Sequence, residues 1–145
     1  MKITICNSAF FWDKALEAQK RLQELGHEAI THPMEVTLRG EKYHVTEYYK
    51  ARKTGWDDDI EKLKEDLIRL HMNHIKESEG VLVLNYEKND IKNYVGGNTL
   101  IEMGVAFALD KKLFMLNPAP EEVSYAEEIK GMRPKVVGND LRLIK

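Results

Sequence analysis

The sequence predicts an α/β protein with an open, mainly parallel five-stranded sheet and helices on both faces. Short apolar runs alternate with longer segments whose apolar residues recur at helical spacing. Residues 81–86 are nearly all apolar, which is typical of a parallel strand buried on both faces. Gly26 and Gly131 each follow a helical segment, where glycine commonly ends a helix. Because crossover helices join parallel strands, this alternation itself indicates the class.

The first part of the chain predicts a strand, a helix and a second strand. Residues 2–6 are expected to form a buried strand, and residues 12–25 an amphipathic helix. Residues 27–31 follow as a short strand that Pro33 ends. Residues 34–56, rich in Tyr, Lys and Glu, have weak periodicity and predict no regular element. The apolar face of the helix consists of Ala15, Ala18, Leu22 and Leu25.

The remainder continues the alternation of helices and strands. A long charged helix is expected over residues 57–78, and its acidic start at Asp57 suits the positive end of the helix dipole. The later elements expected are a strand at 81–86, a polar loop at 87–97, a helix at 99–109, a strand at 113–116, a helix at 121–130, a strand at 135–137 and a tail, 139–145, that could add an edge strand.

Composition indicates one globular domain over residues 1–145. The chain is 43% hydrophobic and 32% charged, which allows a sizeable core. Its 22 Lys and Arg against 24 Asp and Glu give a net charge of -2, so neither nucleic acid nor an anionic membrane is an expected partner. The first residues lack the pattern of a signal peptide, and no apolar run approaches the roughly 20 residues of a membrane span. Cys6, the single cysteine, excludes an intrachain disulfide and fits a reducing cytoplasm.

A ligand site is expected beyond the carboxyl ends of the strands, where the strand order of such a sheet reverses. Three loops then matter, at residues 7–11, 85–98 and 117–121. The backbone amides of a glycine pair before a helix could hold sugar or phosphate oxygens. Two aromatic residues directly after the first strand could stack on a base or belong to the core. The substrate-binding residues expected from these loops are Asn7, Ser8, Phe10, Phe11, Asn85, Gly96, Gly97, Asn98 and Asn117.

Glu102 is the main catalytic candidate because it lies near the start of the apolar helix that follows the glycine pair. The helix dipole favours an ionised carboxylate there. Such a carboxylate can attack an electrophilic carbon, for which the anomeric carbon of a sugar is the usual target. The spacing of Thr99 and Glu102 also matches a capping box, in which the glutamate only caps the helix. Both interpretations stay open at this point.

The segment 98–112, with its Glu-x-Gly-x-Ala-x-Ala pattern from Glu102 to Ala108, resembles the nucleoside 2-deoxyribosyltransferase superfamily. Residues 5–11 are similar to the first-strand loop of that family, and residues 75–85 to its passage from helix into third strand. The resemblance implies a flavodoxin-like three-layer fold and a homodimer or larger assembly. It also implies transfer of 2-deoxyribosyl groups between bases, or hydrolysis of the N-glycosidic bond of deoxynucleoside monophosphates.

Carried over by position, the resemblance makes Glu102 the nucleophile on C1′ of the sugar. The family usually has an Asp in the loop after the third strand, and Asp90 is the candidate here to assist the leaving base. Residues 96–99 are also similar to the glycine-rich loop of lonely-guy-type phosphoribohydrolases, which binds phosphate. A substrate with a 5′-phosphate therefore stays an open alternative. No metal or organic cofactor is expected. The alternative from another class is a non-catalytic module that binds or senses nucleotides.

Other chemistry-bearing residues have simpler expected roles. His71 and His74 lie three apart on a helix, but the sequence places no clear Cys or carboxylate beside them, so hydrogen-bonded histidines are expected rather than a metal site. Cys6 is expected as a small buried hydrophobe. Basic residues surround the tyrosines in segment 42–53, and we expect a lid or a subunit contact there rather than a surface for single-stranded nucleic acid. The tyrosines are Tyr43, Tyr48 and Tyr49.

Overall fold

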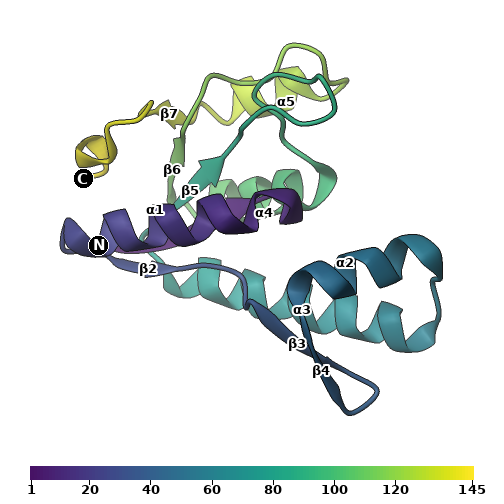
Figure 1. The fold of residues 1–145 in the computed structure, drawn as a ribbon. Helices are drawn as coiled ribbons and strands as arrows, with labels where there is room; N and C mark the ends of the chain where they lie inside the picture. Colours follow the sequence, from purple (N-terminus) through teal and green to yellow (C-terminus); the bar gives the residue numbers. More distant parts are fainter.

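The computed structural model describes all 145 residues and has a central sheet of five parallel strands (Figure 1). The strands run in the order β2-β1-β5-β6-β7, so the order reverses between β1 and β5. Ile5 of β1 pairs with Leu82 of β5, and both side chains are fully buried. The predicted open parallel sheet of five strands is therefore confirmed. The strands are β1 (Lys2–Asn7), β2 (Glu28–Ile30), β5 (Gly80–Leu84), β6 (Lys112–Met115) and β7 (Lys135–Val136).

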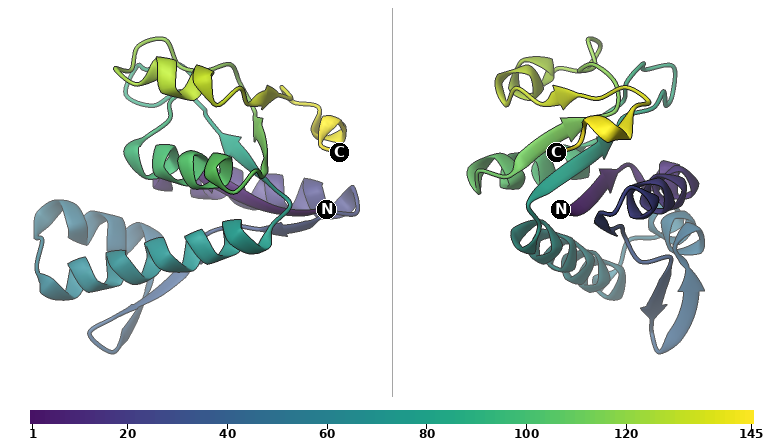
Figure 2. Two further views of the ribbon diagram at one scale, coloured as in Figure 1. Left: turned by 180° about the vertical axis from the view of Figure 1, so that it is seen from behind. Right: turned by 90° about the vertical axis from the view of Figure 1, so that its left-hand side faces the viewer.

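Helices cover both faces of this sheet, giving three layers (Figure 2). One face packs on α1 (Trp12–Glu24) and on the short helix η2 (Leu141–Leu143), and a 13-residue apolar cluster lies between them. The opposite face packs on α3 (Asp58–Glu77), α4 (Gly97–Ala108) and α5 (Ala126–Gly131) around a second cluster of 10 residues. None of the helices combines the length and apolar character that crossing a membrane requires.

Residues 34–56, for which the sequence predicts no regular element, form a hairpin and a helix. β3 (Glu35–Leu38) and β4 (Glu41–His44) pair antiparallel, and α2 (Val45–Thr54) follows them. Arg39 and Gly40 make the two-residue turn, with φ of 51° and 78°. Positive φ at both positions is the geometry that matches the twist of a hairpin. The sequence signal, Arg-Gly between alternating residues, is short and was missed.

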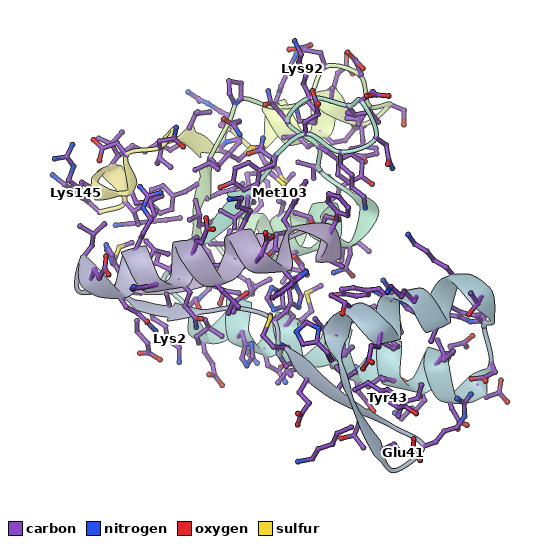
Figure 3. The ribbon with its side chains drawn as sticks, in the orientation of Figure 1. Lys2, Glu41, Tyr43, Lys92, Met103 and Lys145 are labelled. Atoms are coloured by element: carbon purple, nitrogen blue, oxygen red, sulfur yellow. The ribbon has the colours of Figure 1, made fainter.

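This insertion extends away from the sheet beside the first half of α3 (Figures 1 and 2). It has a small core of its own, which holds it to α3. Glu41 and Tyr43 lie at the end of the hairpin, and the Tyr43 hydroxyl donates a 2.7 Å hydrogen bond to Glu41 (Figure 3). The buried residues of this core are Val36, Leu38, Tyr48 and Ile60.

Two expectations about local structure are wrong. Helix α4 begins at Gly97 with Gly96 as its N-cap, so Thr99 lies inside the helix and cannot cap it. The Thr99 hydroxyl is buried without a hydrogen-bond partner, which also contradicts a capping box with Glu102. The tail does not form an edge strand, because it turns into η2 and buries Leu141 and Ile144 against the face that carries α1.

Candidate functional site

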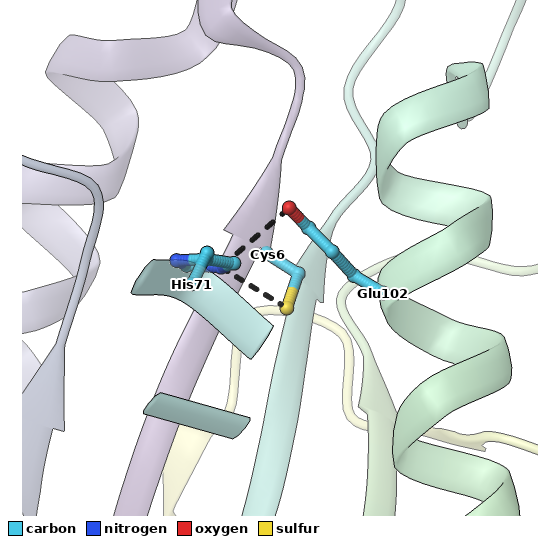
Figure 4. Close-up of side chains that lie close together, drawn as sticks. All are labelled: Cys6, His71 and Glu102. Atoms are coloured by element: carbon cyan, nitrogen blue, oxygen red, sulfur yellow. Dashed lines mark hydrogen bonds and ion pairs between the residues drawn. The ribbon is translucent and has the colours of Figure 1, made fainter. Parts of the chain in front are cut away.

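Glu102 lies in the second turn of α4, where its side chain points at the carboxyl end of β1 (Figure 4). The residue is fully buried. The Nδ2 atom of Asn98, one turn earlier, donates a 2.8 Å hydrogen bond to its Oε1 atom. Its Oε2 atom is buried with no hydrogen-bond partner. A carboxyl group held this way is not a cap, and an unsatisfied buried oxygen calls for an explanation.

Three further side chains from separate elements surround this carboxyl group. His71 of α3 places Nε2 3.7 Å from the Oε1 atom of Glu102 and 3.7 Å from the Sγ atom of Cys6 at the end of β1 (Figure 4). His32, which follows β2, places its Nε2 3.6 Å from the same Oε1. The rings of His32 and His71 stack with centroids 3.7 Å apart. We call Cys6, His32, His71 and Glu102 the buried cluster.

Burial determines the protonation state of the cluster. It raises the pKa of Glu102 to about 8, against the opposing effects of a hydrogen bond with Cys6 and the charge of Lys64. Burial lowers the pKa of His32 to about 4 and that of His71 to about 2. It also raises the pKa of the Cys6 thiol well above its ordinary range. Near pH 7 the four side chains are therefore mainly neutral.

A cavity of about 170 Å³ lies beside the buried cluster, at the carboxyl ends of β1 and β5 where the strand order reverses. His32 and Asn98, which contact Glu102, both line it, so the carboxyl group lies one side chain behind its wall. A larger, shallower hollow near Arg21 and Arg142 has no buried polar cluster beside it. The cavity is lined by Asn7, Ser8, Ala9, His32, Tyr48, Tyr49, Arg52, Lys64, Leu67, Ile68, Lys88 and Asn98.

The cavity is electrostatically suited to an anion. Arg52, Lys64 and Lys88 line it, and no carboxylate does. Lys64 donates a 3.4 Å hydrogen bond to Oδ1 of Asn98, and Lys88 donates one of 3.1 Å to the Ser8 hydroxyl. Partial burial lowers the pKa of both lysines, and the opposite charge of an anionic ligand would offset this effect.

Only part of the first-strand loop lines the cavity as the sequence predicts. Asn7 and Ser8 line it, and the Oδ1 atom of Asn7 is buried without a partner. Phe10 is 66% exposed and lines an adjoining hollow of about 270 Å³ with Lys88. Phe11 instead packs edge-on against Tyr86 at 5.5 Å in the interior, which leaves it outside the cavity wall.

Two predicted asparagines hold strand ends together instead of lining the cavity. Nδ2 of Asn85 donates 3.0 Å bonds to the carbonyls of Asn117 and Pro118. The Asn117 backbone N–H donates to Oδ1 of Asn85 at 2.9 Å, and its Nδ2 atom donates to the Asn85 carbonyl at 3.1 Å. These reciprocal bonds fix the loops after β5 and β6.

The remaining predicted positions lie in or beside the loop before α4. Asn98 lines the cavity, whereas Gly96 and Gly97 form the N-terminus of α4 outside the lining. Asp90 is exposed on a turn, with φ of 63°, and is also outside the lining. A role for Asp90 in assisting the leaving base stays a prediction.

Sequence reasoning anticipated some cavity residues only as part of a lid or interface, and it missed others. Tyr48, Tyr49 and Arg52 belong to the segment expected as a lid or interface, and they do line the cavity. His32 follows a strand end and could have been found by the same rule that selected Asn7. Lys64 lies on a charged helix that offers no sequence signal for a site, because many exposed lysines and glutamates surround it.

No known protein-family model matches the sequence, and no curated protein matches it either. The fold is similar to a solved structure of a 2-deoxyribosyltransferase from the psychrotolerant bacterium Bacillus psychrosaccharolyticus. The two superpose with a TM-score of 0.54 over 94% of this chain and 99% of the other, at 12% sequence identity. That protein is described as a biocatalyst for the synthesis of antiviral and antitumoral nucleosides. At this identity the likeness establishes the flavodoxin-like fold alone.

Proposed function

We propose that the protein cleaves or transfers a glycosyl group at the N-glycosidic bond of a nucleoside or nucleoside 5′-monophosphate, with Glu102 as nucleophile. The observation that carries the proposal is the buried Glu102 carboxyl group, which contacts two lining residues of the cavity through Oε1 and keeps Oε2 without a hydrogen-bond partner. The cavity lies at the switch point of the sheet. Such a point is where open α/β sheets bind ligands. The solved 2-deoxyribosyltransferase with the same fold adds to this support.

The reaction would proceed in two displacement steps. The ionised Glu102 carboxylate attacks C1′, the C1′–N bond breaks, and the base leaves with the bonding electrons and takes up a proton. Asp90 is the proposed proton donor, although its exposed turn would have to approach the cavity. Water, or the nitrogen of a second base, then attacks C1′ and releases Glu102. No metal or organic cofactor takes part in these steps.

Access to Glu102 requires a movement of its two neighbours. The His32 side chain is 18% exposed, whereas that of Glu102 is 1% exposed, so His32 separates the carboxyl group from the cavity. Rotation of His32 or Asn98 would let C1′ reach the oxygen. Because Glu102 has a pKa of about 8, its nucleophilic form grows as pH rises through 8. We expect kcat/KM to rise with pH over that range.

The substrate we favour carries a 5′-phosphate. Arg52, Lys64 and Lys88 would bind it, and no carboxylate lines the cavity itself. The adjoining hollow shares Tyr49, Arg52 and Lys88 with the cavity and adds Phe10, so it offers an aromatic wall for the base. We further propose a cytoplasmic homodimer or larger assembly, supported by the exposed apolar residues of α4, which include Ile101 and Phe107.

A panel of deoxynucleosides and nucleoside 5′-monophosphates tests this function by chromatography of the released base. We expect release by the wild type and none by Glu102→Ala or Glu102→Gln. Glu79→Gln provides the matched control. Glu79 is exposed, and its side chain accepts one hydrogen bond, from the backbone N–H of Lys2. Equal release by Glu102→Gln and the wild type would refute the nucleophile.

A non-catalytic nucleotide-binding module is the second candidate. It is favoured by the mainly protonated, shielded state of Glu102 in this structure. Calorimetry with the same nucleotides separates the two functions. Binding that is unchanged in Glu102→Gln, together with no base release from any member of the panel, would favour this module.

A further inference from the structure

We propose that the buried cluster is a binding site for one divalent metal ion of the zinc type, with Cys6, His71 and Glu102 as protein ligands and water as the fourth. This inference goes beyond the N-glycosidic function and does not rest on it. It departs from the sequence-based expectation that His71 and His74 are hydrogen-bonded histidines rather than metal ligands. The missing Cys and carboxylate come from β1 and α4, and His32 rather than His74 lies next to Glu102.

The spacing of the donor atoms fits a tetrahedral ion. Ligand atoms at about 2.0–2.3 Å from zinc lie about 3.3–3.6 Å from one another at tetrahedral angles. Here Nε2 of His71 lies 3.7 Å from Sγ of Cys6 and 3.7 Å from Oε1 of Glu102. The His32 ring stacks on that of His71 with centroids 3.7 Å apart, so its in-plane lone pair does not point at the same ion. The donor atoms of Cys6, His71 and Glu102 all lie within 4.8 Å of one another.

Hydrogen bonds from Asn98 to Glu102 and between Cys6 and His71 account for only part of this arrangement. Separations of 3.6 and 3.7 Å between an imidazole nitrogen and a carboxyl oxygen exceed those of a normal hydrogen bond. The Oε2 atom of Glu102 and the Nδ1 atom of His71 are buried with no partner. Three fully buried side chains thus converge and leave two polar atoms without a partner, which is costly unless something else binds them.

The charge balance also favours a divalent cation. The buried His71 offers an uncharged imidazole, which keeps a lone pair for a metal. The ion would displace one proton from the Cys6 thiol and one from the Glu102 carboxyl group, so thiolate, carboxylate and M²⁺ sum to zero. The mixed sulfur, nitrogen and oxygen donors match zinc or cobalt, whereas magnesium and calcium prefer oxygen alone.

The surroundings allow entry and set the pH dependence. His32 is part-exposed and lines the cavity, so an ion can enter there. The titratable groups that act on the cluster are Lys64 and His74 of α3 and Tyr49 of α2. The positive charge of Lys64 opposes the cation and lessens the affinity. Affinity should rise with pH, because two protons leave as the ion binds. A bound ion would hold the Glu102 carboxylate and inhibit its attack on a sugar.

Metal titration of the full, untagged and chelator-treated chain tests the site without any substrate. Calorimetry with Zn²⁺ should give one ion per chain, with release of about two protons near pH 7, measured in buffers of different ionisation enthalpy. Co²⁺ should give the visible bands of tetrahedral cobalt and a thiolate charge-transfer band. Because the readout is binding alone, its failure leaves the glycosidic proposal standing, and the reverse also holds.

Variants decide whether the cluster is the binding site. Cys6→Ala should abolish the charge-transfer band, and both Cys6→Ala and Glu102→Gln should weaken zinc binding more than about 100-fold. His27 is the matched control, because its Nδ1 atom lies 3.3 Å from the N-terminal amine and could capture zinc adventitiously. Binding that survives in Glu102→Gln and Cys6→Ala but disappears in His27→Ala would overturn the proposal. So would the absence of tetrahedral cobalt bands from the wild type. Circular dichroism verifies that each variant is folded.

Discussion

The Nδ2 atom of Asn98 donates a 2.8 Å hydrogen bond to the Oε1 atom of Glu102, one helical turn further along α4. Asn98 also accepts a bond from Lys64, so it connects the buried carboxyl group to a cation at the cavity. The position of Glu102 therefore depends on a neighbour of the same helix, and the loop of Gly96 supplies only the start of that helix.

Asn98→Ala should destabilise the protein by about 1–3 kcal/mol, because it leaves Oε1 of a buried carboxyl group without its donor. Urea denaturation followed by circular dichroism measures the change. Asn73, exposed on α3, provides the control Asn73→Ala, which should alter the free energy of unfolding by less than about 0.5 kcal/mol. Equal effects of the two substitutions would show that the bond contributes nothing.

The raised pKa of Glu102 predicts a loss of stability as pH increases. The folded protein keeps the Glu102 proton up to about pH 8, whereas the unfolded chain releases it near the ordinary glutamate pKa of 4.5. The folded state binds more protons between these values, so its stability falls across this window as pH rises. Glu102→Gln cannot ionise and should lack this loss.

The comparison is made by measuring unfolding free energies of wild type and Glu102→Gln from about pH 5 to about pH 9. Glu102→Gln should gain a few kcal/mol relative to wild type toward the alkaline end, because it removes a buried group that must ionise there. The low pKa values of His32 and His71 destabilise the fold below their ordinary pKa of 6.5, and both proteins share this acid effect. A difference that stays constant with pH would contradict burial of a neutral Glu102.

Tyr48 provides a test of the core beneath the hairpin. Its ring is 2% exposed in the cluster with Val36 and Ile60, while its hydroxyl is buried without a partner. Tyr48→Phe removes only the unsatisfied hydroxyl and should leave the stability unchanged or slightly higher. Tyr48→Ala removes the ring and should cost about 3–5 kcal/mol. Thermal and urea unfolding of both variants measure this, and a large loss in Tyr48→Phe would reveal a hidden partner.

The sequence was sufficient for the sheet because its strands carry strong local signals. The run of residues 81–86 and the glycine after α1 indicate a strand and a helix end without any tertiary information. The hairpin was missed because Val36 and Leu38 pack on their own small core rather than on the sheet, and alternation over four residues is a weak signal.

The candidate site also has one residue that the sequence indicates and several that it does not. Glu102 could be found because its pattern is contiguous along α4. Its neighbours could not, because Cys6, His32 and His71 belong to three other segments, and no sequence spacing gives the distances between them. The place of Asn85 at a strand end predicts a site residue, but the same place lets it hydrogen-bond to Asn117 in the loop after the neighbouring strand β6.

Lys88 should govern the preference for a phosphorylated ligand. It lines both the cavity and the adjoining hollow. Burial and the charges of Lys53 and Arg52 lower its pKa, so a bound anion would favour its charged form. Lys88→Met keeps the aliphatic chain and removes the charge. A charge-assisted hydrogen bond contributes about 1.5–3 kcal/mol, so the Kd for a nucleoside 5′-monophosphate should rise about 10-fold to 100-fold. The Kd for the matching nucleoside should hardly change.

Lys50→Met, on the exposed side of α2, is the control and should leave both Kd values unchanged. Calorimetry of the two ligands provides the measurement, and equal losses for nucleoside and monophosphate would place the phosphate elsewhere.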